Sequence, residues 1–591
     1  MKEMGRTSRS RLVKVVGSAL AAVLVGTVVS GTSTQAASKP AAVKTGGFIT
    51  VGIDGGVSGH CFNNALAGGA LGTSRAIYEQ LFERNKQGKF VGYLAESATT
   101  TDNKVWNIKL RAGIKYSNGE AFNAANVKMN LDTGRGIVPI SKAGFLGTGV
   151  AVNANIYSVE VVDDLNVKVT LDRPDSALPA LIYRAGRYVM RANEQANSPS
   201  TCATKPIGTG PFMMKSFSTD TAEVVRNPNY WRKDKNGVQL PYLDGITFVN
   251  VKEASQRAAA VRTGSIDAGF FTQGDATFTQ DLSRRKSVVT GYASTPTAYG
   301  QWVPNVGKKD SPFKFKSCRL AVAHAMDWNA YNKVRLKGTG SYSGSIVGKE
   351  NPMFTLKGAP KFSIAKSKEY QTTCNTELGA KGPMKLTLYA DTSSQSLNNV
   401  KFIKQQLEKA GIAMNEITQS ESVVLIGKIY AAGGNAFDFA EGTPAEGASP
   451  AYVAPFFMSN AWPKGSTNPV LADMAKLSDT IAAATGKARD DLQTKFGIIL
   501  ALGNHGDTKV DDLTYAAMAE TNPAKNKAAW QAVAEYIQTE GYAIPAVHGG
   551  FKVFVSKKSK LKGIGTLPLP GGGLAETVET KGFEWTGVSK G

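Results

Sequence analysis

The 591-residue chain contains little histidine and little cysteine. The four histidines show no HExxH spacing, and they are His60, His324, His505 and His548. The four cysteines form no CxxC pair or other metal-ligand spacing, and they are Cys61, Cys202, Cys318 and Cys374. The sequence therefore predicts neither a metal site nor a cofactor.

Catalytic signatures are also missing. No GxSxG nucleophile elbow occurs, and the one Lys-Thr-Gly run (44–46) precedes every Ser-x-x-Lys, the wrong order for a serine acylase. Gly208-Thr209-Gly210 lacks the further glycine of a dinucleotide loop, so it is interpreted as a turn. These absences favour a binding protein over an enzyme, and a secreted hydrolase remains the alternative class.

Long apolar runs are missing after the first thirty residues. Basic residues precede an apolar run at 15–29, which is shorter than the ~20 residues that span a bilayer. Small residues follow, so residues 1–36 are predicted to be a signal peptide cleaved after Ala36 or Ala37. The alternative is an uncleaved anchor. No cysteine lies near the cleavage site to carry a lipid, so the protein is expected in the periplasm or outside the cell.

Negative charge is scarce, because the net charge is +22. The basic residues are scattered rather than gathered with aromatic residues in one module, so nucleic acid is not a predicted partner. A basic surface beside an anionic cell wall or membrane is the preferred interpretation.

The length exceeds what one hydrophobic core serves, so two or three lobes are expected, with 42% hydrophobic and 20% charged residues typical of a globular protein. Alternation and turn residues predict a first strand at 47–54 and a strand through Trp106 at 105–110. They also predict a hairpin at 156–171 and a later strand at 384–389. Helical periodicity predicts helices at 72–82, 257–261, from 317, 399–411, 481–502 and 528–540. The strand–helix–strand order after residue 384 predicts a parallel sheet.

Three runs in the middle of the chain carry a family resemblance: P-I-G-T-G-P-F at 206–212, R-N-P-N-Y-W at 226–231 and P-Y-L-D-G-I at 241–246. Their order resembles the central signature of the peptide/nickel-type solute receptors of ABC importers. I-Y-E-Q-L-F-E-R (77–84) and the segment 105–127 are similar to the same family, although Asn126 stands where the family usually has an acidic residue.

The resemblance implies an α/β, periplasmic-binding-protein-like fold with two main lobes, an extra insert lobe and a hinged ligand cleft. It implies a discontinuous lobe I at 38–77, 204–300 and 544–591, lobe II at 78–203 and lobe III at 301–543. The protein would be a monomeric receptor that captures a peptide or similar organic solute and delivers it to membrane permease subunits.

Candidate ligand contacts follow partly from the residues and partly from the resemblance. His60 and Asn63 lie in the loop at the carboxyl end of the first strand, where α/β sheets bind ligands. The resemblance adds a later set, which is Trp302, Asn305, Asp438, Glu446, Tyr452 and Trp462. The family's Trp-x-x-Asp-Tyr core is missing, so an oligosaccharide or another solute stays open beside a peptide.

The even cysteine count suggests two disulfides in an oxidising compartment, with three possible pairings. The pairing Cys61–Cys202 and Cys318–Cys374 is predicted because it keeps each bridge local to one lobe or hinge.

Overall fold

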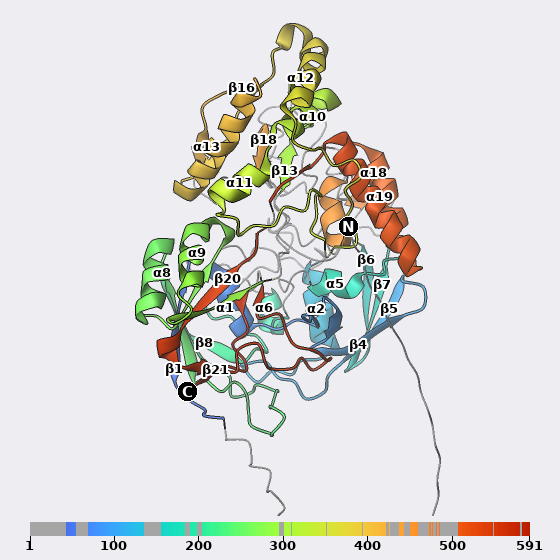
Figure 1. Cartoon of the computed structure of the whole chain (residues 1–591). Helices are drawn as coiled ribbons and strands as arrows, with labels where there is room; N and C mark the ends of the chain where they lie inside the picture. The colour runs from blue at the N-terminus through green and yellow to red at the C-terminus, as the bar shows by residue number, and fades with distance from the viewer. Residues whose placement is uncertain are drawn as a thin grey trace, which may run out of the picture. The chain divides into compact units, whose positions relative to one another are not determined.

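The protein is described from a computed structural model (Figure 1). Apart from isolated residues between 425 and 488, the structure describes residues 43–54, 69–134, 155–183, 190–197, 204–294, 301–308, 310–349, 351–392, 394–420, 437–441, 450–458, 506–547, 549–579 and 582–591. Within them, no helix has the length and apolar character that crossing a membrane requires.

A seven-stranded sheet gathers strands from three distant parts of the chain. Its order is β12 (Val289–Ala293), β20 (Lys552–Ser556), β11 (Ala268–Phe271), β1 (Phe48–Ile53), β10 (Gly245–Asn250), β9 (Thr221–Arg226) and β8 (Phe212–Phe217). The central strands β11, β1 and β10 are parallel, and the outer pairings are antiparallel. The predicted first strand is thus confirmed, and it lies inside the sheet.

Alternating side chains give this sheet two buried faces. Phe270 joins the apolar cluster of one face with α1 (Gly69–Ile77), while its neighbour Phe271 joins the other. The second face is covered by α8 (Ala254–Thr263) and α9 (Ala276–Arg284), which supply Val261 and Leu282. Helix α8 is capped at its C-terminus by Gly264, whose φ of +79° is a left-handed conformation that glycine adopts readily.

A separate four-stranded antiparallel sheet has the order β4 (Ala95–Thr100), β5 (Val105–Leu110), β7 (Asn166–Leu171) and β6 (Ile156–Asp163). Trp106, Ile108 and Leu110 are buried, as their alternation predicts. The β6–β7 hairpin turns where Asp163 accepts a hydrogen bond from the backbone of Leu165, at 2.9 Å. Helix α2 (Ala124–Gly134) contributes to the same core.

The helix predicted for 72–82 is wrong at its end. Helix α1 stops at Ile77, and Phe82–Arg84 forms strand β2, paired with β3 (Phe90–Gly92). The cause is the signature turn: Gly210 N–H donates to the carbonyl of Ile77 at 2.9 Å. A Cβ at Gly208 would lie 2.1 Å from the same oxygen, so only glycine permits this approach.

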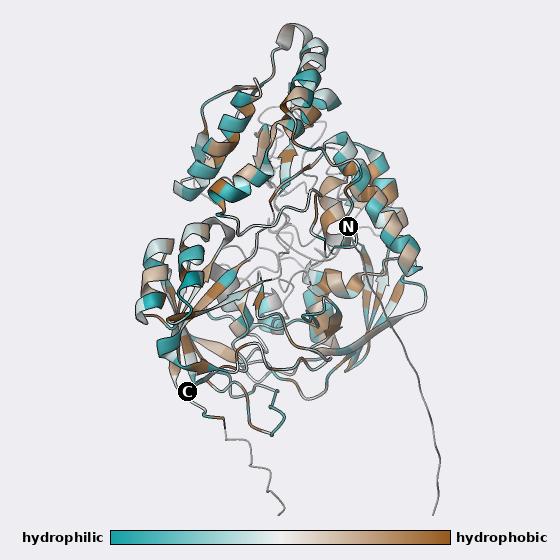
Figure 2. Cartoon of the chain, viewed as in Figure 1, coloured by the Kyte–Doolittle hydropathy of each residue, from teal (hydrophilic) through white to brown (hydrophobic). Residues whose placement is uncertain are grey.

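A three-stranded sheet organises the third region, with β13 (Gln301–Pro304) between β18 (Phe439–Glu441) and β19 (Ile544–Pro545). The parallel pairing predicted after residue 384 is confirmed in two short pairs, β14 (Lys385–Leu386) with β16 (Ala413–Met414) and β15 (Tyr389–Asp391) with β17 (Thr418–Ser420). Between them, α13 (Ser394–Lys409) buries Ile403 and Leu407. Figure 2 shows its hydrophilic and hydrophobic turns.

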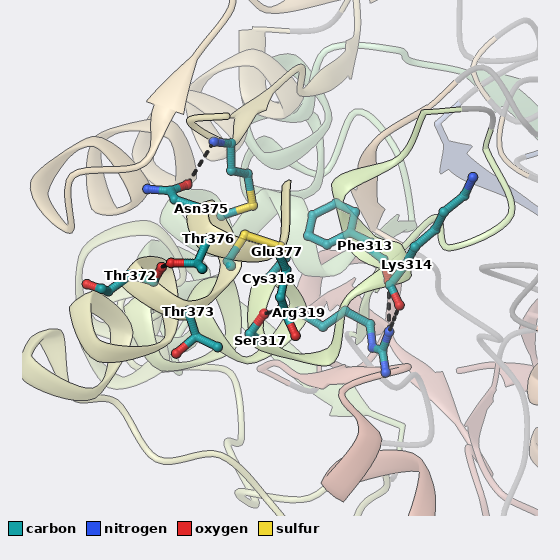
Figure 3. The surroundings of a disulfide bond; sticks show 12 residues. Phe313, Lys314, Ser317, Cys318, Arg319, Thr372, Thr373, Asn375, Thr376 and Glu377 are labelled. Carbon is teal, nitrogen blue, oxygen red and sulfur yellow. Dashed lines mark hydrogen bonds between the residues drawn. A yellow bond between two sulfur atoms is a disulfide. The ribbon is translucent and has the colours of Figure 1, made fainter. Parts of the chain in front are cut away.

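Cys318 of α10 (Lys316–Ala325) is bonded to Cys374 of α12 (Ile364–Leu378), which confirms one predicted disulfide (Figure 3). Both cysteines are fully buried in one apolar cluster. Beside the bridge, Ser317 donates a hydrogen bond to Glu377. Cys61 and Cys202 lie outside the described residues, and their pairing stays a prediction.

Two consecutive helices, α18 (Thr508–Ala519) and α19 (Pro523–Glu540), share an apolar cluster with Val303 of β13. Helix α19 begins five residues before the predicted Ala528, because Asn522 caps it and Pro523 occupies its first turn. The helix predicted for 481–502 lies almost wholly outside the described residues.

The chain passes twice between the seven-stranded and three-stranded sheets. It leaves β12 and enters β13, and it returns from β19 to β20. The crossings are adjacent at both ends, because β12 pairs with β20 and β13 pairs with β19. Ser294 and Phe551 fix them to each other: Ser294 N–H donates to the Phe551 carbonyl, and Phe551 N–H donates to Ser294 Oγ, each at 2.9 Å.

The C-terminal segment after β20 packs on early parts of the chain. Arg75 in α1 pairs with Glu584 at 3.0 Å, and Arg84 in β2 lies 3.5 Å from Glu579, with all four side chains nearly fully buried. Burial would raise the pKa of the Glu584 carboxyl, but Arg75 and the Thr586 hydrogen bonds outweigh it and hold the pKa below its usual range. The segment therefore joins α1 and β2 through buried ion pairs.

Candidate solute-binding site

The parallel strands of the large sheet place three chain ends side by side. Strands β10, β1 and β11 run in the same direction, so their carboxyl ends lie at one edge, after Asn250, Ile53 and Phe271. In open α/β sheets this is the edge where ligands bind. The structure puts a charged cluster there.

Arg257 is the centre of that cluster. Its guanidinium is fully buried, and it donates to the carbonyl of Val251 at 2.6 Å and to Asp275 Oδ2 at 2.8 Å. It also lies 4.8 Å from the centre of the Phe271 ring. Asp275 in turn accepts a hydrogen bond from Thr272 N–H at 2.9 Å, which fixes both charges to the ends of β10 and β11.

Asp54 follows β1 directly and is electrostatically coupled to the same pair. Burial raises the pKa of its carboxyl from 3.8 to about 6; Arg257 lowers it and the Asp275 carboxylate raises it. Near neutral pH the group is a poorly solvated carboxylate at the carboxyl ends of the parallel strands. It can accept hydrogen bonds from an ammonium or another N–H donor.

The third region approaches this edge. A Cβ at Gly274 would lie 3.2 Å from Gln395 Cγ in α13, and Gln280 Nε2 donates to the Lys337 carbonyl at 3.2 Å. The charged cluster is thus next to residues of α13 and of the 337–349 loop.

Three predicted ligand contacts lie together on the ladder of β13 and β18. Trp302 is 5% exposed, and its ring packs against those of Phe439 and Trp328, with centroids 4.9 and 6.5 Å away. Asn305 is buried, and its amide donates to the Phe437 carbonyl at 3.0 Å. These contacts account for both residues as part of the core.

Asp438 is held from two sides. Its Oδ1 is paired with the Lys308 ammonium, and its Oδ2 accepts a hydrogen bond from Thr387 N–H at 2.8 Å. The carboxylate is 6% exposed. It therefore joins β18 to the turn between β14 and β15.

The other predicted contacts cannot be placed. His60, Asn63, Glu446 and Trp462 lie outside the described residues, and Tyr452 belongs to α15 (Pro450–Val453) with its side chain undescribed. Among the described residues, no group of three or more His, Cys, Asp or Glu side chains could hold a metal ion.

Glu79, which sequence reasoning did not single out, is the partner of the signature stretch. Its carboxylate accepts hydrogen bonds from Tyr230 OH at 2.9 Å, Trp231 Nε1 at 2.8 Å and Thr209 Oγ1 at 3.0 Å. Burial raises its pKa from 4.5 to about 7, against the lowering effect of these donors and of Arg232. The conspicuous rings at 230–231 therefore position a buried acid rather than a solute.

Comparison with known proteins matches this architecture. Residues 89–468 match the profile of bacterial extracellular solute-binding proteins, family 5 (middle region). The glutathione-binding protein GsiB of Escherichia coli K12 is 26% identical over 423 residues, which cover 70% of this chain and 78% of that protein. GsiB of Salmonella typhi is also 26% identical, over 420 residues.

Solved structures share the fold. A protein AgaA of A. tumefaciens R10 with agropinic acid has a TM-score of 0.69 at 19% identity, covering 92% of this chain and 99% of its own. A dipeptide-binding protein of Pseudoalteromonas sp. SM9913 with Met-Leu has a TM-score of 0.69 at 18% identity, covering 90% of this chain and 99% of its own. NikZ of Campylobacter jejuni with Ni(L-His) has a TM-score of 0.67 at 15% identity, covering 91% of this chain and 97% of its own.

The sheets, their paired crossings and these shared structures define a periplasmic-binding-protein-like α/β fold. The chain belongs to family 5 of the bacterial extracellular solute-binding proteins, which bind peptides or related solutes for ABC importers. Its homologues are binding proteins rather than enzymes.

Proposed function

We propose that this protein is the exported receptor of an ABC importer, which captures a peptide or similar organic solute by hinge closure and presents it to a membrane permease. The paired crossings between the two sheets are the observation that carries this proposal. The two crossings are adjacent at each end, so we propose that they form a hinge, between β12 and β13 and between β19 and β20, about which the sheets move as units. A solute that contacts both sides favours the closed state.

The lobes proposed for this motion are those predicted from the sequence. Lobe I comprises 38–77, 204–300 and 544–591, lobe II 78–203 and lobe III 301–543. The sheet pairings support this division, since the seven-stranded sheet draws on the first set and the four-stranded sheet on the second. Strand β19, at the start of the last segment, pairs with β13 of lobe III, so we propose that the return crossing follows it.

A solute with an amino group fits the described charges best. Asp54 offers a partly buried carboxylate at the ligand-binding edge, whereas both oxygens of Asp438 already have partners. The close packing of Trp302 weighs against an oligosaccharide stacked on its ring. The names of the GsiB relatives make glutathione the first peptide to test.

Mass spectrometry of solute released from the purified exported protein tests the proposal, followed by calorimetric titration of the identified compound. We expect a small organic molecule bound at one site, and weaker binding by Asp54→Asn than by the control variant Asp512→Asn, which changes an exposed side chain of α18. If Asp54→Asn bound the solute as tightly as the unaltered protein, the assignment of Asp54 would be wrong.

The secreted hydrolase is the alternative from another class. Incubating the protein with its solute and analysing the mixture separates the two. An intact solute supports a receptor, and accumulating product would overturn that function.

A further inference from the structure

We infer that the edge of the seven-stranded sheet opposite the charged cluster is a docking surface for a membrane rich in anionic phospholipids. The strand directions bring basic residues from separate parts of the chain to this edge. It holds the residues that precede β11 and β12, which begin there, and those that follow β20, which ends there. The basic edge is defined as Arg262, Arg284, Arg285, Lys286, Lys557, Lys558, Lys560 and Lys562, all of which are exposed.

Hydrogen bonds show that these residues are neighbours in space. Lys558 Nζ donates to the Thr263 carbonyl at 2.9 Å, which puts it beside Arg262. Lys557 N–H donates to the carbonyl of Val288 at 2.9 Å, and Val288 is two positions after Lys286 in the chain. The C-terminal Gly591 N–H donates to the Lys560 carbonyl at 2.9 Å.

Little negative charge offsets the basic edge. Asp281 pairs with Arg285 at 2.8 Å, and its pKa is held below the usual range by this hydrogen bond and by the nearby Arg262 and Arg284. Asp267 lies 3.6 Å from a further lysine, Lys590. Among the residues that the structure describes, the other seven members of the basic edge form no ion pair with a carboxylate, so part of the net charge of +22 is concentrated on one end of the sheet.

Two neighbouring features favour a lipid surface over another polyanion. Phe48, at the start of β1, is 45% exposed at the same end of the sheet. Lys590 Nζ donates to the Phe48 carbonyl at 2.9 Å, so an exposed ring lies beside a cation. An apolar ring next to basic side chains suits the interface of a bilayer, because the ring can enter the lipid head-group layer while the lysines pair with lipid phosphates.

Vesicle binding tests the inference with a matched pair of variants. The exported protein is mixed with phosphatidylcholine vesicles containing 30% phosphatidylglycerol, or none, in low salt. In the edge variant, Arg284, Lys286, Lys557 and Lys562 are changed to Gln. In the control variant, Lys366, Lys368, Lys385 and Lys401 of lobe III are changed to Gln, so that both lose the same charge.

We expect the protein to bind only the anionic vesicles, and 0.5 M salt to abolish this binding. The edge variant should lose more than a hundred-fold in vesicle affinity, at roughly five-fold for each residue changed. The control variant should lose far less. Equal losses in both variants would mean that only net charge matters and would overturn the inference, as would binding to polyphosphate or RNA but not to vesicles. Solute binding by both variants verifies that they fold.

Discussion

At the scale of single residues, burial and long-range partners decide what the conspicuous side chains do. The rings of Tyr230 and Trp231 and the hydroxyl of Thr209 all serve the buried Glu79 carboxylate. Glu79 precedes its partners by 130 to 152 positions in the chain. No local pattern links residues so far apart, so the sequence predicts the packing role of the rings but not the acid that they position.

Glu79 should make stability depend on pH. Its folded-state pKa of about 7 lies above the ordinary 4.5, so its contribution to stability is complete below pH 4.5 and is lost as the pH rises through about 7. The difference corresponds to about 3 kcal/mol. We expect Glu79→Gln to flatten the decline in melting temperature between pH 5 and 8, as followed by circular dichroism.

The exposed Glu160→Gln serves as the control for this titration, because Glu160 is 52% exposed. An unchanged pH profile in Glu79→Gln would show that another group causes the decline.

Two arginines with equal ion-pair distances should differ greatly in their effect on stability. Arg75–Glu584 and Arg226–Asp244 both measure 3.0 Å, but the first pair is 5% and 9% exposed and the second 35% and 47%. Arg75→Met leaves a buried carboxylate without its cation and should cost about 3–5 kcal/mol. Arg226→Met should cost less than about 1 kcal/mol. Urea unfolding measures both, and equal costs would contradict the argument.

At the scale of elements, strong periodicity predicts strands and helices well, and tertiary contacts decide where they end. Trp106, Ile108 and Leu110 alternate in β5, and the 156–171 hairpin forms as predicted. Helix α1 ends early because the backbone of Ile77 receives Gly210 from a distant turn. The predicted strand at 384–389 divides into β14 and β15, because Thr387 N–H turns to Asp438 instead of a neighbouring strand.

The disulfide between α10 and α12 should stabilise this region by restricting the unfolded chain. The bridge joins cysteines 56 positions apart, and a loop of that length is worth about 4 kcal/mol. Replacing both cysteines by Ser should lower the melting temperature, as should reduction of the unaltered protein. If the double variant had the same melting temperature as the oxidised protein, the bridge would have no stabilising role.

At the scale of the whole molecule, the fold and the family are readable from the order of short motifs, whereas the solute is not. Of the predicted contacts that the structure describes, Trp302, Asn305 and Asp438 pack in the core. Asp54 is the residue proposed above to bind an amino group, and its pKa depends on Arg257 and Asp275, more than 200 residues further along the chain. Sequence alone does not reveal such a juxtaposition.

Solute should both compact and stabilise the receptor. At a free concentration of one hundred times the Kd, binding adds about 2.7 kcal/mol to the free energy of unfolding. We expect a higher melting temperature and a smaller radius of gyration by X-ray scattering in the presence of the co-purifying solute. A higher melting temperature with an unchanged radius would indicate binding without closure.

The place of β20 in the large sheet sets an order on biosynthesis. β20 separates β11 from β12, so the strand made almost last completes a layer begun by the strand made almost first. Among the described strands β12 pairs only with β20, so it stays unpaired until residue 556 has left the ribosome. This layer therefore stays incomplete until the chain is almost finished, which would suit the export proposed above. Stalled chains ending before residue 552 should remain sensitive to protease across this sheet, whereas chains released after it should become resistant.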